Sequence, residues 1–261
     1  MTAPTPPAPP AAVVLLHALS LDSGMWAAQT SALRASGHEV LAFDQRGFGT
    51  APLGDVPPSL DVVADDLARA LDDRGTGRAV LVGCSMGAYV AMTFLRRHPG
   101  RCAALALLSA RATADSPEVR EQRLLFADLM RDETRRAPVL KLAGEQLVGA
   151  TTREDRPGLA ARVRADAAAA DPTALAWAQR AIAQRQDASE TLRALRVPAV
   201  VLAGAEDDLV TAEESRTTAE LLPHGRLVTV PGAGHLPPLE SPETVTAELT
   251  TLLARTGTPA C

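Results

Sequence analysis

The sequence predicts an α/β domain in which a mainly parallel sheet carries helices on both faces. The first observation is that short apolar runs alternate along the chain with segments of helical periodicity. The second is that these runs are continuous, which is typical of strands buried on both faces of a parallel sheet. The third is a block from 111 to 193 that contains helical patterns and no convincing strand. We therefore expect a sheet core with a helical insertion.

The elements follow one another as strand and helix units. The expected strands are 12–18 (AVVLLHA), 38–44 (HEVLAFD), 78–84 (RAVLVGC), 102–110 (CAALALLSA), 198–204 (PAVVLAG) and 226–232 (RLVTVPG). The expected helices of the core are 26–36, 60–75, 86–100 and 242–255, and the clearest helical patterns of the block are 117–132 and 172–186. Glycine or proline closes most of these helices, as at Gly37 and Pro99. Right-handed crossovers between parallel strands place the helices on both faces.

This reading divides the chain into three parts. We expect a disordered, proline-rich tail over residues 1–12, because its composition favours no packed structure. The core is expected over 13–110 and 194–261, and the helical cap insertion over 111–193.

Composition excludes several function classes. The formal net charge is −5 and no run of Lys or Arg occurs, so we expect no nucleic-acid partner. No apolar run approaches the ~18 residues that a membrane span needs. Three cysteines at unrelated spacings argue against a disulfide framework or a zinc site, and no metal or dinucleotide motif implies a cofactor. We expect a soluble, cytoplasmic protein with a small-molecule substrate, and no feature predicts an oligomeric state.

The most informative short segment is GCSMG, in which Ser85 stands two residues after Gly83 and two before Gly87. A nucleophile between a strand and a helix must project from a sharp turn, which requires neighbours without bulk. The helix that begins just after Ser85 directs free N–H groups and its positive dipole end at any oxyanion formed there. The alternative is a glycine-rich turn in which the serine has no chemical role.

Two later segments favour the catalytic reading. VVLAGAEDDLV places three acids, Glu206, Asp207 and Asp208, just past one strand, and VPGAGHL places His235 just past the next. A serine hydroxyl needs an adjacent base, and the base needs an acid that orients it. The chain order of serine, acid and histidine is the one associated with a nucleophile on such a turn. Because all three follow parallel strands, we expect them to meet where the carboxyl ends of these strands lie together.

These segments resemble those of the α/β-hydrolase fold family. The resemblance covers nearly the whole chain after the tail, and within the family it is closest to small cap-bearing esterases and enol-lactonases. The segments that carry it are LLHALSLDSGMW, FDQRGFG, GCSMGAYVA, LAGAEDDLVT and VPGAGHLPPLESPE. One departure is His17-Ala18, where the family usually has His-Gly. Another is that only about 12 residues precede this segment, so we expect six parallel strands with 38–44 at one edge.

The resemblance implies a role for each site residue. Ser85 would be the nucleophile and His235 the general base, then the general acid. Counting three residues on from Gly204 selects Asp207 as the acid, with Asp208 as the alternative.

The backbone N–H groups of Leu19 and Met86 would form the oxyanion hole, with His17 holding the Leu19 loop in shape. Candidate pocket residues are Trp26, Arg111, Phe126 and Trp177. Each of the three aromatic residues has packing as its alternative, and Arg111 has an ion pair between cap and core.

The expected function is hydrolysis of a small ester, lactone or thioester through an acyl-enzyme. Serine at the turn argues against haloalkane dehalogenase and epoxide hydrolase chemistry, for which the family uses an aspartate nucleophile. Two alternatives stay open. One is a C–C hydrolase or a non-hydrolytic lyase or cyclase in a biosynthetic pathway. The other is a ligand-binding receptor that retains the three residues.

Overall fold

Six parallel strands form a single sheet in the order β2-β1-β3-β4-β5-β6 in the computed structural model, which describes residues 11–256. The strands are β1 (Ala12–Leu16), β2 (Val40–Phe43), β3 (Ala79–Cys84), β4 (Cys102–Leu108), β5 (Ala199–Gly204) and β6 (Leu227–Val230). The predicted sheet class, the strand number and the edge position of β2 are confirmed. Of the tail predicted over 1–12, residues 1–10 lie outside the described residues, and Ala12 already begins β1.

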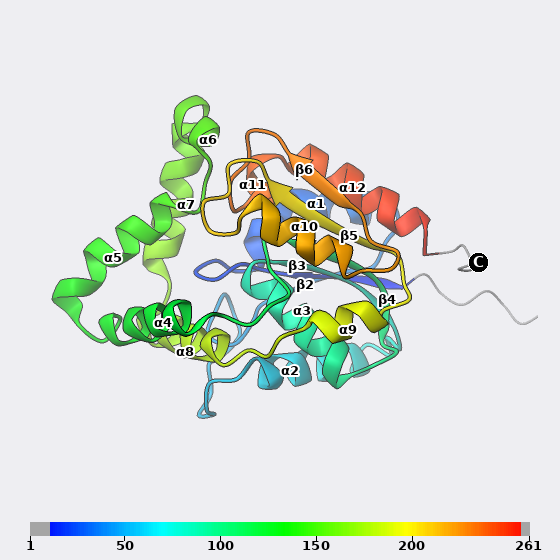
Figure 1. Cartoon of the computed structure of the whole chain (residues 1–261), viewed down its shortest axis with the longest axis horizontal. Helices are drawn as coiled ribbons and strands as arrows, with labels where there is room; N and C mark the ends of the chain where they lie inside the picture. Colours follow the sequence, from blue (N-terminus) through cyan, green and yellow to red (C-terminus); the bar gives the residue numbers. More distant parts are fainter. Residues whose placement is uncertain (1–10, 257–261) are drawn as a thin grey trace, which may run out of the picture.

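Helices cover both faces of this sheet (Figure 1). The core helices are α1 (Ala27–Ala35), preceded by a 3₁₀ turn over Ser23–Trp26, α2 (Leu60–Asp72), α3 (Met86–Arg97), α9 (Ser189–Ala194), α10 (Ala212–Glu220), α11 (Pro237–Glu240) and α12 (Pro242–Ala254). Helices α2, α3, α9 and α10 contribute to the hydrophobic cluster on one face, and α1 and α12 to the cluster on the other.

Strand β1 shows why its apolar run is continuous. Val14 and Leu16 belong to the cluster on the α3 face, whereas Val13 and Leu15 belong to the cluster on the α12 face, and none of the four is exposed to solvent. Successive side chains of a strand point to opposite faces. Helices on both faces therefore require an apolar residue at every position.

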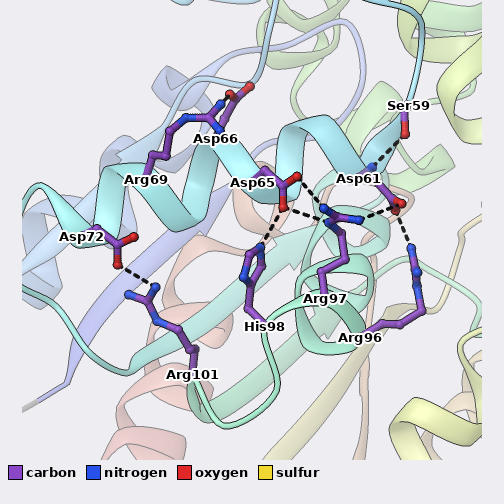
Figure 2. Close-up of polar contacts among 10 residues, drawn as sticks. All are labelled: Ser59, Asp61, Asp65, Asp66, Arg69, Asp72, Arg96, Arg97, His98 and Arg101. Carbon is purple, nitrogen blue, oxygen red and sulfur yellow. Dashed lines mark hydrogen bonds and ion pairs between the residues drawn. The ribbon is translucent and has the colours of Figure 1, made fainter.

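The packing of α2 on α3 combines an apolar stripe with a row of ion pairs. Ser59 caps α2, and the stripe buries Val63, Leu67 and Leu71. Beside this stripe, Arg97 of α3 bridges Asp61 and Asp65, with N–O distances of 3.1 and 2.6 Å (Figure 2). These side chains are about one-third exposed, so each pair contributes only ~0–1 kcal/mol. Apolar burial holds the two helices together, and the ion pairs favour one register.

Between β4 and β5 the chain forms a group of helices that stands beside the sheet (Figure 1). They are α4 (Pro117–Leu129), α5 (Glu133–Glu145), α6 (Ala150–Asp155), α7 (Pro157–Ala169) and α8 (Pro172–Ala183). Helix α4 packs on α8 and α5 on α7, whereas α9, which follows, packs on α3 in the core. We call α4 to α8 the cap. Within residues 11–256 no helix is both long and apolar enough to cross a membrane.

Candidate active site

Ser85 occupies a strained turn between β3 and α3. Its backbone angles are φ 52° and ψ −114°, which residues other than glycine rarely adopt. Its amide donates to the Leu108 carbonyl of β4 at 2.8 Å, which holds the turn to the sheet. A side chain at Gly87 would overlap the backbone carbonyl of Leu16, and one at Gly83 would overlap the backbone of Gly87. The glycines flanking Ser85 therefore have the steric reason that the sequence predicted.

The structure brings His235 and Asp207 to this serine from the loops after β6 and β5. His235 Nε2 lies 2.8 Å from Ser85 Oγ, and His235 Nδ1 lies 3.0 and 2.9 Å from the two carboxylate oxygens of Asp207. A carboxylate can only accept, so Nδ1 carries the proton and Nε2 is free to accept the proton of the serine hydroxyl.

The Asp207 carboxylate is held in the ionised state. Burial alone would raise the pKa of this carboxyl. The electrostatic interaction with His235, the hydrogen bond from His235 and the amides of Leu209 and Val210 outweigh burial, so the pKa lies below its ordinary value. An ionised Asp207 is the form that can orient His235 and stabilise its positive charge.

The two acids beside Asp207 have other environments. Glu206 accepts hydrogen bonds from the amide and the hydroxyl of Thr151 in α6, at 2.8 and 2.5 Å. Asp208 is exposed. Among the described residues, only Asp207 of these three acids contacts His235.

Two backbone amides lie free beside the serine. Met86 is the first residue of α3, so its N–H has no partner within the helix. Leu19 stands in the loop after β1, before Ser20 with its φ of 71°. Within residues 11–256 neither amide donates to a backbone carbonyl. Both are thus available to a developing oxyanion.

His17 anchors the loop that carries Leu19. Its Nδ1 lies 2.9 Å from the Ala18 carbonyl, and its Nε2 accepts from the amide of Gln45 at 3.0 Å. Burial lowers the pKa of His17 from 6.5 to about 4, against smaller opposing effects of the Ala18 carbonyl and of Asp44. The imidazole is therefore neutral near pH 7, as its role of accepting from Gln45 requires.

Glu240 holds the loop of His235 in place. This carboxylate is buried and accepts from the amides of Gly234 and Leu236, which flank His235, both at 3.0 Å. Its other oxygen accepts from the amide of Gly149, immediately before α6, at 2.7 Å. One side chain thus joins the histidine loop to the cap.

A cavity of about 410 Å³ opens over these groups between cap and core. Its lining includes Leu19, Ser85, Tyr89, Arg111, Phe126 and His235. Arg111 forms an ion pair with Glu214 at 2.5 Å. Glu214 lies on α10 in the core, and Arg111 is the first residue of the insertion expected over 111–193, so the ion pair weighed as the alternative for Arg111 is present.

The two tryptophans expected in this pocket lie elsewhere. Trp26 is fully buried in the cluster on the α12 face, where apolar packing holds the start of α1. Trp177 of α8 turns its indole N–H to the Val56 carbonyl at 2.8 Å and packs against the loop before α2. Neither lines the cavity at Ser85. For both residues the packing alternative is correct.

The model of the alpha/beta hydrolase fold family matches residues 11–242. The chain belongs to the α/β-hydrolase fold family. Among solved structures, a thermophilic esterase from Thermogutta terrifontis, with malate bound, is 35% identical to this α/β-hydrolase with a TM-score of 0.90, covering 95% of this chain and 91% of that one. The enol-lactonase from Burkholderia xenovorans LB400 is 27% identical with a TM-score of 0.84, covering 96% and 94%.

Curated relatives of this α/β-hydrolase match over different lengths. The bifunctional esterase/perhydrolase DCH from Acinetobacter calcoaceticus is 26% identical over 89% of this chain and 88% of its own. Two other relatives match locally, and the chain covers only 47% and 28% of their lengths.

Sequence reasoning missed several residues of this α/β-hydrolase site. Tyr89 stands four residues after Ser85 on α3, a spacing that places both on one helix face and could have revealed it. Glu240, Arg123 and Gln179 had no comparable signal, because their positions depend on how α11 and the cap pack.

Proposed function

We propose that this α/β-hydrolase is a serine hydrolase that cleaves a small ester, lactone or thioester through an acyl-enzyme. The observation that carries the proposal is the hydrogen-bonded series from Ser85 Oγ to His235 to Asp207, at 2.8 to 3.0 Å, on the wall of a cavity. Among the relatives, one is named an esterase and one an enol-lactonase, which supports an acyl–oxygen bond as the bond that breaks.

The first half-reaction acylates Ser85. The hydroxyl oxygen attacks the substrate carbonyl while His235 Nε2 takes its proton. The negative charge that forms on the carbonyl oxygen is stabilised by the N–H groups of Leu19 and Met86. His235 then gives the proton to the leaving alcohol or thiol, and Asp207 stabilises the imidazolium throughout.

The second half-reaction uses the same groups on water. His235 takes a proton from a water molecule, the hydroxide adds to the acyl carbonyl, and collapse returns the proton to Ser85 Oγ. One water is consumed, and an acid and a free serine result.

The cavity volume sets the substrate size. A cavity of about 410 Å³ between cap and core lies toward the lower end of the ~300–1,000 Å³ range of small-molecule sites, which favours a compact molecule over a long alkyl chain. Short acyl or cyclic substrates are therefore favoured over lipids.

A panel of p-nitrophenyl esters tests this proposal. We expect turnover of the acetate and butyrate, much slower turnover of the dodecanoate, and loss of all three activities in Ser85→Ala. Folded protein that cleaves no ester, lactone or thioester would overturn the hydrolase assignment and favour a lyase or a receptor.

A further inference from the structure

Positive charge and hydrogen-bond donors gather on one wall of the cavity. Arg111 lies just past β4, Tyr89 on α3, Arg123 on α4 and Gln179 on α8, and all four line the same cavity as Ser85. Segments far apart in the sequence therefore supply this wall, which we call the arginine wall.

The charges around the arginine wall do not cancel. Arg111 pairs with Glu214 at 2.5 Å, and Arg123 shares Asp115 with Arg185, at 2.7 and 2.5 Å. Arg185 does not itself line the cavity, but with it three guanidinium groups share two carboxylates, which leaves one positive charge in this group. Asp115 and Arg185 are almost fully buried, with 2% and 4% of their side chains exposed.

The acids of the site come from the loop after β5, and not from the elements that carry the arginine wall. Asp208 lines the cavity beside the loop of His235 and is exposed, and Asp207 is bound to His235. Arg185 lies over the ring of Tyr89 at 4.2 Å from its centre, so its charge adds to the same wall.

The wall is also rich in donors. Guanidinium groups only donate. The Oε1 atom of Gln179 already accepts from Arg123 at 3.0 Å, which leaves its NH₂ group as a donor. An apolar acyl chain against this wall would leave the excess positive charge of the three guanidinium groups uncompensated, which is unfavourable. A carboxylate offers an opposite charge and acceptor oxygens.

We propose that the arginine wall binds a substrate carboxylate, so that the substrate is a half-ester of a short dicarboxylic acid. This inference rests on the proposed hydrolase function. Tyr89 stands in the first turn of α3, and its amide donates to the Ser85 carbonyl at 3.2 Å, so this wall lies close to the nucleophile. The carboxylate is therefore separated from the reacting carbonyl by a short carbon chain. Hydrolysis consumes one water and releases the alcohol and a dicarboxylate.

Two esters of equal acyl length test the inference. Mono-p-nitrophenyl glutarate carries the carboxylate, and p-nitrophenyl pentanoate lacks it. We expect kcat/KM for the glutarate ester to exceed that for the pentanoate at least tenfold. Arg111→Gln and Arg123→Gln should each lower this ratio about tenfold or more, as loss of a hydrogen bond to a charged group predicts.

A third variant should move the ratio in the opposite direction. Glu214→Gln removes the partner charge of Arg111, and a glutamine can still complete the capping box that Glu214 forms with Thr211. We expect the ratio of kcat/KM for the glutarate ester to kcat/KM for the pentanoate ester to rise. Arg180→Gln is the matched control, because Arg180 pairs with Asp128 and does not line this cavity. Its ratio should equal that of the wild type.

Binding to the Ser85→Ala variant separates this inference from the proposed function. Calorimetry should show that monomethyl glutarate, which has one free carboxylate, binds at least tenfold more tightly than methyl pentanoate, which has none, and that adding Arg111→Gln removes the difference. Tighter binding of monomethyl glutarate without ester turnover would defeat the hydrolase function alone. Equal binding of the two methyl esters, or a ratio of kcat/KM values that is unchanged by substitution of Arg111, Arg123 and Glu214, would overturn the arginine wall.

Discussion

Three consecutive acids follow β5, and each has a different environment. Glu206 binds Thr151 of the cap, Asp207 binds His235, and Asp208 lies exposed at the cavity mouth. The Asp207 side chain is only 1% exposed. In this site a carboxylate hidden from solvent and fixed by two backbone amides keeps His235 Nδ1 protonated.

Asp207→Asn and Asp208→Asn form a matched pair. An asparagine at 207 cannot hold the same tautomer of His235, and kcat on p-nitrophenyl butyrate should fall by ~10⁴, as in other such triads. Asp208→Asn should change kcat by no more than a few-fold. If Asp208→Asn caused the larger loss, the acid would be Asp208.

His17 should make the stability of the protein depend on pH. Its pKa is about 4 in the folded state and 6.5 ordinarily, so between these values the unfolded chain binds the extra proton. Stability is therefore lost as pH falls through this window. Between pH 7 and 4.5 the loss from His17 should be about 2–3 kcal/mol.

Urea unfolding of the wild type and His17→Gln at both pH values measures this loss. The variant should be less stable at pH 7, because the hydrogen bond from the Gln45 amide to His17 Nε2 is disturbed. Its free energy of unfolding should nevertheless fall less than that of the wild type between pH 7 and 4.5. Equal losses in the two proteins would show that His17 does not titrate in this way.

At the scale of elements, α11 and the start of α6 meet at the loop of His235. Glu240, the last residue of α11, accepts three backbone N–H groups, two beside His235 and one at Gly149. A glutamine offers one acceptor atom, so at least one buried donor would lose its partner, at a cost of about 1–3 kcal/mol. Glu240 is a positioning residue that acts through His235.

Glu240→Gln should lower kcat at least tenfold at a temperature where the protein stays folded, with a smaller change in KM. The rate at which a fluorophosphonate labels Ser85 should fall in parallel, which lost stability alone would not produce. Glu243→Gln, an exposed neighbour in α12, is the control. Unchanged kcat and labelling rate in Glu240→Gln would refute the positioning role.

At the scale of the whole molecule, the site joins segments that lie far apart in the chain: Ser85 and His235 are 150 residues apart. The sequence still predicted their meeting, because parallel strands bring their carboxyl ends to one edge. Strand positions could also be predicted, because helices on both faces of the sheet require an apolar residue at every strand position and so produce continuous apolar runs in the sequence. We expect a strand over 38–44, but only Val40–Phe43 form β2, and the interior strands β1 and β4 likewise end before the expected residues.

The cap resisted prediction for a different reason. Its helices carry no motif, and α5 and α7 show almost no amphipathic periodicity, so the sequence pattern does not determine which helix faces the serine. Phe126 and Arg111 reached the cavity, whereas Trp26 and Trp177 did not, because aromatic residues pack equally well in either place. Arg123 and Gln179 became visible only through the contacts of α4 with α8.

The central claim is that Ser85 is an activated nucleophile, and the most direct measurement is covalent labelling. A fluorophosphonate reacts with a serine whose proton is removed by an adjacent base. Intact mass spectrometry of the treated protein should show one adduct per chain, and peptide mapping should place it on Ser85. Ser85→Ala, checked for folding by circular dichroism, should carry none. An adduct that persists in Ser85→Ala, or folded wild-type protein that takes no label, would contradict the account.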